Sequence, residues 1–297
     1  MPFNFEKNLI VKKRMFPLNT HKVIKDELKF SFRDSGKIYW RLRDESLVPT
    51  AHSIADIVNN ISNNNIPPCI RLFKLNDRKA TLLLDIKDGN GRLYVIKIFF
   101  LKRLEHRLKY HKYALDESAN LLRAHKRNIN VPKVYGYGVF KSGFWGLVKT
   151  GVVILEYLPN VYTIGELMAC KNEFERQCIF LATIPLFVSL YNAGCNHIDI
   201  NNHAVMMTDD AEKTAYLLDF QHARFYKNPS LEILMFEAAY FAKGCREYVP
   251  EQAINEWVTQ ILTRVNIIES SELQPAKRRF RYYYNKKLTR KRRRNLI

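Results

Sequence analysis

The hydrophobic pattern of the chain becomes strand-like near residue 70. Short apolar runs between turn residues cover 70–75, 80–86, 92–100, 134–140 and 150–157. Such runs, rich in β-branched and aromatic residues, are typical of strands. A charged helical stretch over 102–126 follows the third run. The pattern therefore predicts an antiparallel sheet of about five strands, with one helix inserted after the third strand.

The pattern becomes helical after Pro159. An apolar helix is predicted over 172–192, with a kink at Pro185, because proline lacks the amide hydrogen that a helix interior needs. The remaining predicted elements are two short strands and two helices. They cover 203–207, 214–218, 230–242 and 250–267.

The ends of the chain differ from this central part. Residues 1–65 are weakly patterned and are interpreted as an N-terminal extension. Residues 66–158 hold the predicted sheet, residues 159–273 the helical part, and residues 274–297 a basic tail. The division predicts two packed units with an extension at each end.

The composition fits a folded protein. Of the 297 residues, 47% are hydrophobic, which suits one large domain or two domains of about 150 residues each. The five cysteines are odd in number, widely spaced and without a CxxC pair. They give neither a disulfide framework nor a zinc signature, so core thiols in a reducing compartment are expected.

Neither a signal peptide nor a membrane span is expected. Residues 1–16 lack the apolar stretch of a signal peptide, and the longest apolar run, 178–190, is interrupted by Pro185. The sequence therefore predicts a cytoplasmic protein that does not cross a membrane.

The positive charge is concentrated in the basic tail. The formal net charge is +19, and the last 21 residues hold eleven basic residues and no acidic one, which leaves +8 for residues 1–276. Interleaved tyrosines suit this tail to an anionic membrane surface. Nonspecific contact with nucleic acid phosphates and a solvated, disordered tail are the alternatives.

Four candidate residues follow one another in an informative order. Lys97 lies within an apolar strand, where an ammonium is costly unless an anion meets it. Glu117 lies 20 residues further on, in the inserted helix. Asp199 lies in the loop after the apolar helix, and Asp219 ends a hydrophobic strand. This is the order of a kinase-like phosphotransferase: a phosphate-binding lysine, its glutamate partner, a catalytic aspartate and a metal-binding aspartate.

Each candidate also has a structural explanation when taken alone. Lys97 is compatible with an edge strand, Glu117 with a solvated helix face, and Asp199 with a turn. The apolar neighbours of Lys97 and the matching spacing of Asp199 and Asp219 favour the functional interpretation.

Local sequences then resemble one family. Residues 197–203, HIDINNH, resemble the HxDLNAHN loop of Kdo kinases, and LYNAG at 190–194 resembles their preceding helix end. The segment 74–100, with a glycine-poor hairpin and a VIKIFF strand, resembles core heptose kinases. DFQHAR at 219–224 resembles their metal strand. Over about residues 70–245, the chain resembles the lipopolysaccharide kinase family.

The resemblance implies an α+β, two-lobed protein-kinase-like fold. Its small N-lobe is an antiparallel sheet with one inserted helix, and its C-lobe is mainly helical. The resemblance also implies that Asp199 orients the acceptor hydroxyl, that Lys97 and Glu117 serve the nucleotide phosphates, and that Asp219 holds Mg²⁺.

Two further regions take roles from the resemblance. Glu156 and Leu158, at the end of the fifth strand, fall where the family's hinge meets adenine. The turn at 77–79 covers the nucleotide without offering a glycine.

One position departs from the family pattern. Ala204 stands where the family has a metal-binding asparagine. Either Asn201, Asn202 or His203 supplies the second metal contact, with His203 as the first candidate, or the enzyme uses a single metal, or the protein is a degenerate kinase.

The sequence therefore predicts an ATP-dependent kinase that phosphorylates a Kdo or heptose hydroxyl of the lipopolysaccharide inner core, with ATP and Mg²⁺ as cofactors. The expected partners are a lipopolysaccharide core or lipid A precursor and the inner face of the cytoplasmic membrane, reached through the basic tail; nucleic acid is not expected. The alternative is a degenerate kinase-fold protein that binds anionic glycolipid, membrane or a partner without turnover.

Overall fold

The computed structural model describes residues 20–34, 38–63, 65–68, 70–85, 92–142, 146–267 and 271–296. Residues 1–16, where no signal peptide is expected, and Cys69 lie outside these ranges. Cys195 and Cys245 are buried thiols as expected, whereas Cys170 is exposed and Cys178 half-buried. No helix within the described ranges combines the length and the apolar character needed to cross a membrane.

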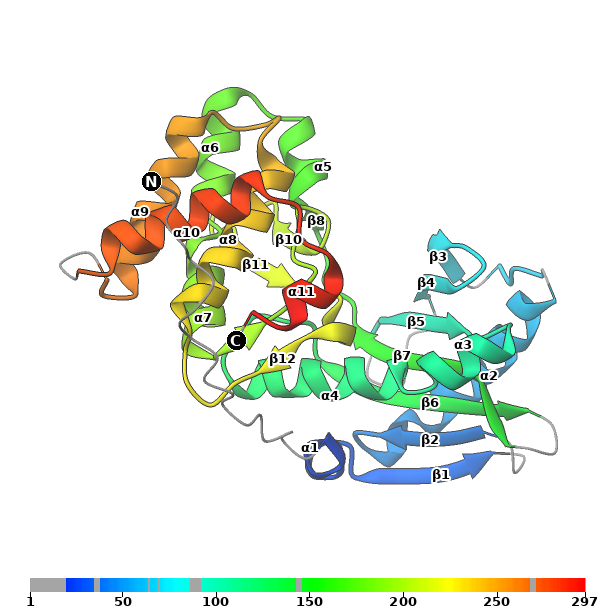
Figure 1. The fold of residues 1–297 in the computed structure, drawn as a ribbon. Helices are drawn as coiled ribbons and strands as arrows, with labels where there is room; N and C mark the ends of the chain where they lie inside the picture. The colour runs from blue at the N-terminus through cyan, green and yellow to red at the C-terminus, as the bar shows by residue number, and fades with distance from the viewer. Residues whose placement is uncertain are drawn as a thin grey trace.

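The N-terminal half is built on a seven-stranded antiparallel sheet in the order β1-β2-β6-β7-β5-β4-β3. Its strands are β1 (Phe30–Asp34), β2 (Ile38–Leu42), β3 (Ile70–Leu75), β4 (Lys79–Leu84), β5 (Tyr94–Phe100), β6 (Val134–Ser142) and β7 (Leu147–Glu156). The last five correspond to the five predicted strands. The sheet is lower right in Figure 1.

Each face of this sheet packs against a helix. Ile96 and Ile98 of β5 join one hydrophobic core with α2 (Val48–Ser62), while Phe99 joins the core that holds α4 (Tyr113–Lys126) and the C-terminal half. Because strand side chains alternate between faces, Lys97 lies on the same face as Phe99. This alternation points Lys97 toward α4. The short helix α1 (Thr20–Glu27) packs against α4.

The segment interpreted as an N-terminal extension contributes strands β1 and β2 and helices α1 and α2 to this unit. β1 and β2 extend the sheet beyond β6, and α2 covers its second face. Trp40 of β2 is fully buried against Gly138 of β6, where an added Cβ would lie 2.4 Å from the indole ring. This close contact holds β2 against β6. The apolar pattern of residues 30–42 was too short to predict these strands from the sequence.

Two predicted helices are divided in the structure. The helix predicted over 102–126 is α3 (Leu104–Tyr110) followed by α4. No residue of α3 is buried, whereas α4 packs on the sheet. The break between the two helices therefore falls where the chain enters the core. The kinked helix predicted over 172–192 is α6 (Glu173–Leu181) followed by α7 (Ile184–Asn192). Pro185 lies in the first turn of α7, where its missing amide costs nothing, so it starts a helix.

The C-terminal half is mainly helical, as predicted. Its helices besides α6 and α7 are α5 (Ile164–Ala169), α8 (Leu231–Cys245), α9 (Glu251–Arg264), α10 (Leu273–Asn285) and α11 (Arg290–Arg294). Its short strands are β8 (Val161–Thr163), β9 (Cys195–Asn196), β10 (Val205–Thr208), β11 (Ala215–Leu217) and β12 (Arg224–Phe225). They form a β11-β10-β8 sheet and a β12-β9 pair.

The basic tail is folded onto this half. Helix α10 packs along α8 through buried Phe280 and Tyr283. The chain then turns back, and α11 lies next to β12 at the junction of the two lobes (Figure 1). The solvated, disordered tail is therefore excluded for residues 273–294.

Candidate active site

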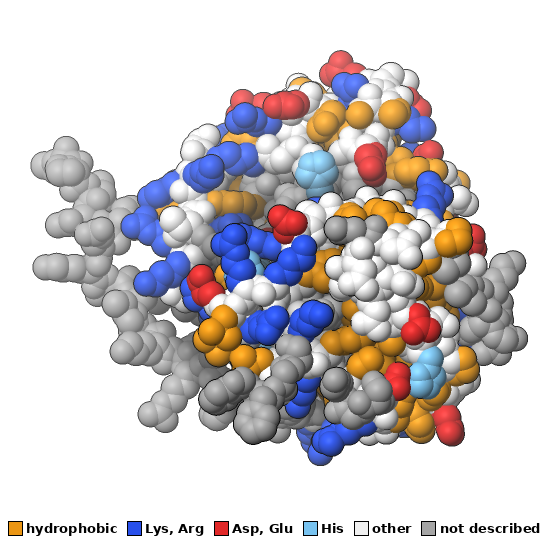
Figure 2. Space-filling model, turned by 90° about the vertical axis from the view of Figure 1, so that its right-hand side faces the viewer, with side chains coloured by type: hydrophobic (Ala, Val, Ile, Leu, Met, Phe, Trp, Pro, Cys, Tyr) orange, Lys and Arg blue, Asp and Glu red, His pale blue; other side chains and the backbone are white. Residues whose placement is uncertain are grey.

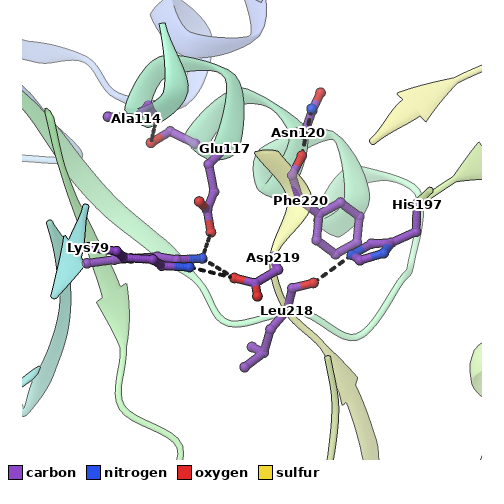
Figure 3. A network of polar contacts seen from close by, with 10 residues as sticks. Lys79, Ala114, Glu117, Asn120, His197, Leu218, Asp219 and Phe220 are labelled. Atoms are coloured by element: carbon purple, nitrogen blue, oxygen red, sulfur yellow. Dashed lines mark hydrogen bonds and ion pairs between the residues drawn. The ribbon is translucent and has the colours of Figure 1, made fainter. Parts of the chain in front are cut away.

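Four charged side chains from four separate segments meet between the lobes. Lys97 of β5 pairs with Glu117 of α4 and with Asp219, which follows β11. Lys79, the first residue of β4, places its Nζ 3.1 Å from Asp219 Oδ1. We call Lys79, Lys97, Glu117 and Asp219 the phosphate-side cluster; Figure 3 shows Lys79 extending from the sheet toward Asp219.

The burial of the phosphate-side cluster is graded. Glu117 and Lys97 are 1% and 5% exposed, whereas the side chain of Asp219 is 44% exposed. Breaking a buried ion pair on one side costs about 3–5 kcal/mol, because it leaves a buried charge without its partner. The inner pair therefore fixes Lys97, and Asp219 presents its carboxylate at the open side.

The charges of the cluster shift one another's protonation. Burial alone would disfavour the Lys97 ammonium, but the Asp219 and Glu117 carboxylates outweigh it and raise the pKa of Lys97 above its usual range. The Lys97 ammonium in turn lowers the pKa of Asp219 well below its usual range, against the effect of burial. Burial, and then the charge of Lys97, lower the pKa of Lys79 to about 8.

A short turn carries Lys79 into the site. The Asn76 side-chain oxygen accepts hydrogen bonds from the amides of Arg78 and Lys79, at 3.0 and 2.9 Å. The Asn76 amide donates to the Lys79 carbonyl oxygen at 3.0 Å. An asparagine that bonds its own turn is a common way to close such a turn without glycine.

The Asp219 segment is braced from both lobes (Figure 3). Asp219 itself has a left-handed backbone, with φ 63°. Asn120 of α4 donates to the carbonyl oxygens of Phe220 and Ala223, at 2.9 and 3.1 Å. On the other side, the His197 Nε2 lies 2.6 Å from the Leu218 carbonyl oxygen. Burial lowers the pKa of His197, so the ring is neutral and donates this hydrogen bond.

The loop that carries Asp199 contains a strained residue. Ile198 is a fully buried, β-branched residue with φ 75°, a conformation that costs about 1–3 kcal/mol and persists where neighbours hold it. The Ile198 amide donates to the Glu237 carboxylate of α8 at 2.9 Å. Burial raises the pKa of Glu237 to about 8, so this carboxyl is mostly protonated at neutral pH.

The tail reaches the same loop. The Arg293 Nη1 lies 2.9 Å from Asp199 Oδ1 and donates to the Ile198 carbonyl oxygen at 2.7 Å. Both side chains of this ion pair are largely covered, with 17% and 19% exposed. We call Ile198, Asp199, Glu237 and Arg293 the catalytic-loop cluster.

The predicted hinge residues lie at the end of β7. Glu156 forms the last pair of the β5–β7 ladder with Tyr94, and its side chain accepts a hydrogen bond from the Lys133 amide at 3.1 Å. Leu158 follows and lines a groove of about 430 Å³ together with Asn160 and Tyr216.

The predicted metal residues lie in different surroundings. Asn202 is half-buried, and its amide lies between α5 and α8: an added Cβ at Gly165 would lie 3.1 Å from its Nδ2, and one at Gly244 3.2 Å from its Oδ1. His203 is exposed. Asn201 braces the loop, because its Oδ1 accepts from the His203 and Ala204 amides at 2.8 and 3.0 Å. Within the described ranges, no three His, Cys, Asp or Glu side chains group as a metal site.

Three residues of these clusters were not predicted from the sequence. Lys79 falls in the turn expected to cover the nucleotide, just before the strand predicted over 80–86, and its side chain was given no role. Glu237 lies in an apolar helix, and this buried acid is a signal of a special role. Arg293 is one of five consecutive basic residues, 290–294, and no local feature distinguishes it from the others.

The fold and this arrangement define a kinase-like phosphotransferase. A model of the lipopolysaccharide kinase (Kdo/WaaP) family matches residues 74–230, more than half of the chain. The chain therefore belongs to the lipopolysaccharide kinase family, whose members transfer a phosphoryl group to a sugar hydroxyl. The resemblance inferred from the sequence is confirmed.

The structural comparison agrees on the fold. A solved structure described as "WaaP in complex with acyl carrier protein" matches with a TM-score of 0.50 and 14% identity, over 77% of this chain and 97% of that chain. At this identity the match shows the fold alone, and it confirms the predicted two-lobed kinase-like architecture. No curated protein matches the chain.

Proposed function

We propose that this enzyme transfers the γ-phosphoryl group of ATP to a Kdo or heptose hydroxyl of the lipopolysaccharide inner core. The observation that carries the proposal is the meeting of Lys97, Glu117 and Asp219 from three separate elements. A buried ammonium beside a half-exposed carboxylate is the arrangement that polyphosphate binding with a metal requires. The family range, residues 74–230, includes all three residues.

Lys97 and Lys79 are proposed to bind the nucleotide phosphates. Glu117 keeps Lys97 charged and directed out of the sheet. Two ammonium groups already in place cost no reorganisation when the phosphates arrive. Glu156 and Leu158 are proposed to border the adenine, because they end the strand that is paired directly with β5.

The residues present fit a magnesium ion that arrives with the nucleotide. Mg²⁺ keeps several waters and needs only one or two protein carboxylates beside substrate phosphates, and Asp219 offers a half-exposed carboxylate at this place. His203, which is exposed, is the proposed second contact rather than Asn202, whose half-buried amide lies between Gly165 and Gly244. When bound, the ion neutralises charge on the phosphate oxygens.

Asp199 is proposed to orient the acceptor hydroxyl and to accept its proton. A positioned base of this kind contributes about 10²- to 10⁴-fold to a rate. The test uses purified protein, Mg-ATP and deacylated core oligosaccharides that contain Kdo alone or Kdo and heptose. Mass spectrometry is expected to show one added phosphate on one of them, and a wild-type protein that binds no ATP would refute the proposal.

The basic tail is proposed to hold the enzyme at the anionic membrane surface that carries its acceptor. Figure 2 shows a band of Lys and Arg side chains over the left and middle of one face, interrupted by few acidic side chains. The exposed cations of α10 and the following residues are Arg278, Arg281, Lys286, Lys287, Lys291 and Arg292. Each is worth about 1 kcal/mol near an anionic surface, and Tyr282, 50% exposed, adds an interfacial aromatic ring.

Vesicle sedimentation tests the membrane proposal. Vesicles with phosphatidylglycerol are expected to bind the protein, in a way that salt weakens, and vesicles of phosphatidylcholine alone are not. Replacing Arg281 and Lys287 by glutamate should release the protein, whereas the same change at exposed Lys74 of β3 should not. Equal binding to both vesicles would exclude this role.

A degenerate kinase that binds glycolipid without turnover is the second candidate. It is favoured by Ala204, which is buried and places no ligand atom where the family has asparagine. Glycolipid binding without any phosphorylated product, unchanged by Asp199→Ala, would support it over the first.

A further inference from the structure

Two side chains from distant helices hold the backbone of Ile198, one at its amide and the other at its carbonyl oxygen. Glu237 of α8 accepts the hydrogen bond of its amide, and Arg293 of α11 donates to its carbonyl oxygen. The left-handed backbone of Ile198 is unfavourable for a β-branched residue and needs such support. Because Asp199 follows directly, the direction of its carboxylate depends on both contacts.

Helix α11 is anchored to the strand pair that leads into this loop. The Asn196 Nδ2 donates to the Arg293 carbonyl oxygen at 3.3 Å, and the Arg224 Nη1 donates to the Arg294 carbonyl oxygen at 3.1 Å. Asn196 and Arg224 are direct partners in the β9–β12 ladder. The last carbonyls of α11 therefore bond to the strands that flank the catalytic loop.

The chain before α11 is also fixed. The Tyr240 hydroxyl accepts from the Leu288 amide at 2.7 Å and donates to the Leu288 carbonyl oxygen at 3.3 Å. The ring of Tyr240 also lies under the Arg293 guanidinium, 5.2 Å away, a contact that favours arginine. One residue of α8 thus holds both the approach to α11 and the arginine itself.

We propose that Arg293 is a positioning residue of the phosphoryl-transfer site: it fixes the Ile198 peptide and the Asp199 carboxylate in the orientation that accepts the sugar hydroxyl. This rests on the proposed role of Asp199 as the base. The planar guanidinium bonds a carbonyl and a carboxylate at once, which a lysine cannot match. Residues 197–204 contain no Lys or Arg, so the tail supplies a cation that the loop itself lacks.

Paired variants test this role. Arg293→Ala is expected to lower kcat by about 10- to 100-fold, as small misplacements of a reacting group do, with little change in the KM for ATP. Arg264→Ala is the control, because it removes one positive charge at an exposed position of α9, away from the loop. Arg293→Lys should restore part of kcat, and added guanidinium ion should partly rescue Arg293→Ala.

Hydrogen exchange gives a second measurement that needs no turnover. The amide of Ile198 is expected to exchange faster in Arg293→Ala than in the wild type or Arg264→Ala, with the same melting temperature. An inactive wild type would refute the proposed function, and the exchange would still decide whether Arg293 holds the loop. Unchanged exchange, unchanged kcat, or a higher kcat, as an inhibitory tail would give, would each overturn the positioning role.

Discussion

Lys97 and Asp199 belong to the same candidate site, but their surroundings come from different parts of the chain. All members of the phosphate-side cluster lie within residues 74–230, the range of the family match. In the catalytic-loop cluster, Glu237 and Arg293 lie beyond that range. The family pattern therefore includes the groups proposed for the nucleotide, while the support of the proposed base comes from segments outside it.

This comparison suggests that nucleotide binding and alignment of the acceptor are separable. The phosphate-side cluster connects the two lobes through the ion pairs of Lys97 and Lys79 with Asp219. The catalytic-loop cluster lies within the C-terminal half and is closed by the tail. Variants on the two sides should therefore change different kinetic constants.

The largest effect is expected from Asp199→Ala. Loss of the proposed base should lower kcat by about 10²- to 10⁴-fold, while ATP binding by calorimetry stays within a few-fold. Asp56→Ala, at an exposed position of α2, is the control and should keep full activity. A large loss of ATP affinity in Asp199→Ala would contradict the separation of the two clusters.

Lys97→Met should act on the other side. It removes the buried ammonium proposed for the phosphates, so kcat/KM for ATP is expected to fall by about 10²- to 10³-fold. It also leaves Glu117 buried without its partner, so the free energy of unfolding should fall by about 3–5 kcal/mol.

A double variant distinguishes these two effects. Adding Glu117→Leu to Lys97→Met removes the remaining buried charge, so urea denaturation should show recovered stability without recovered activity. If stability and activity returned together, Lys97 would have only a structural role.

Lys79 should give a smaller, pH-dependent effect. Its pKa is about 8, so the ammonium loses its charge as pH rises through this value, and phosphate attraction weakens. The kcat/KM of the wild type for ATP should fall above about pH 8. Lys79→Arg keeps its positive charge, so its kcat/KM for ATP should stay constant to a higher pH than that of the wild type. Lys79→Gln should have a kcat/KM about 10-fold lower than the wild type below pH 8.

The control for Lys79 is Lys74→Gln, at an exposed position of β3. It should leave the pH profile of kcat/KM unchanged. An alkaline limb that persists unaltered in Lys79→Arg would assign it to another group.

The smallest effect on activity is expected from Glu237→Gln. The carboxyl has a pKa of about 8 against a usual 4.5, so at pH 7 it is mostly protonated, and glutamine resembles that form. We expect kcat to change by less than about 3-fold, because the hydrogen bond from Ile198 is kept.

The stability of Glu237→Gln should depend on pH. Between pH 4.5 and 8 the unfolded chain loses the Glu237 proton while the folded chain keeps it, so the wild type becomes less stable as pH rises. Glutamine does not titrate, so the free energy of unfolding of Glu237→Gln, measured by urea denaturation, should exceed that of the wild type by an amount that grows toward pH 8, to at most about 5 kcal/mol. An advantage that is equal at pH 5 and pH 8 would place the Glu237 pKa near its ordinary value.

Much of the fold could be predicted from local patterns. Strands β3 to β7 and helices α8 and α9 coincide with periodic runs, because a long apolar period identifies its element. Strands β1 and β2 were missed because each has five residues, and β1 alternates between partly buried and exposed positions at the sheet edge. The breaks between α3 and α4 and between α6 and α7 follow from packing, which helical periodicity does not report.

The candidate site divides in the same way. The order of Lys97, Glu117, Asp199 and Asp219 was visible as spacing, and the structure brings Lys97 to both Glu117 and Asp219. Their chemical roles, and those of Glu156, Leu158, Asn202 and His203, remain predictions. The packing of the Asn202 amide could not be predicted from the sequence, because it depends on how closely Gly165 and Gly244 approach this side chain.

The sequence by itself determined that Lys97 lies on the opposite face of its strand from Ile96 and Ile98, because strand side chains alternate, and that the tail is strongly basic. Only the tertiary structure decided what that charge does. Among the basic residues 290–294, Arg293 reaches Asp199 because the end of α11 is hydrogen-bonded to the β9–β12 pair and the Tyr240 ring packs against the Arg293 guanidinium. A run of like charges has no local preference among its members, so long-range packing selects the residue that enters the site.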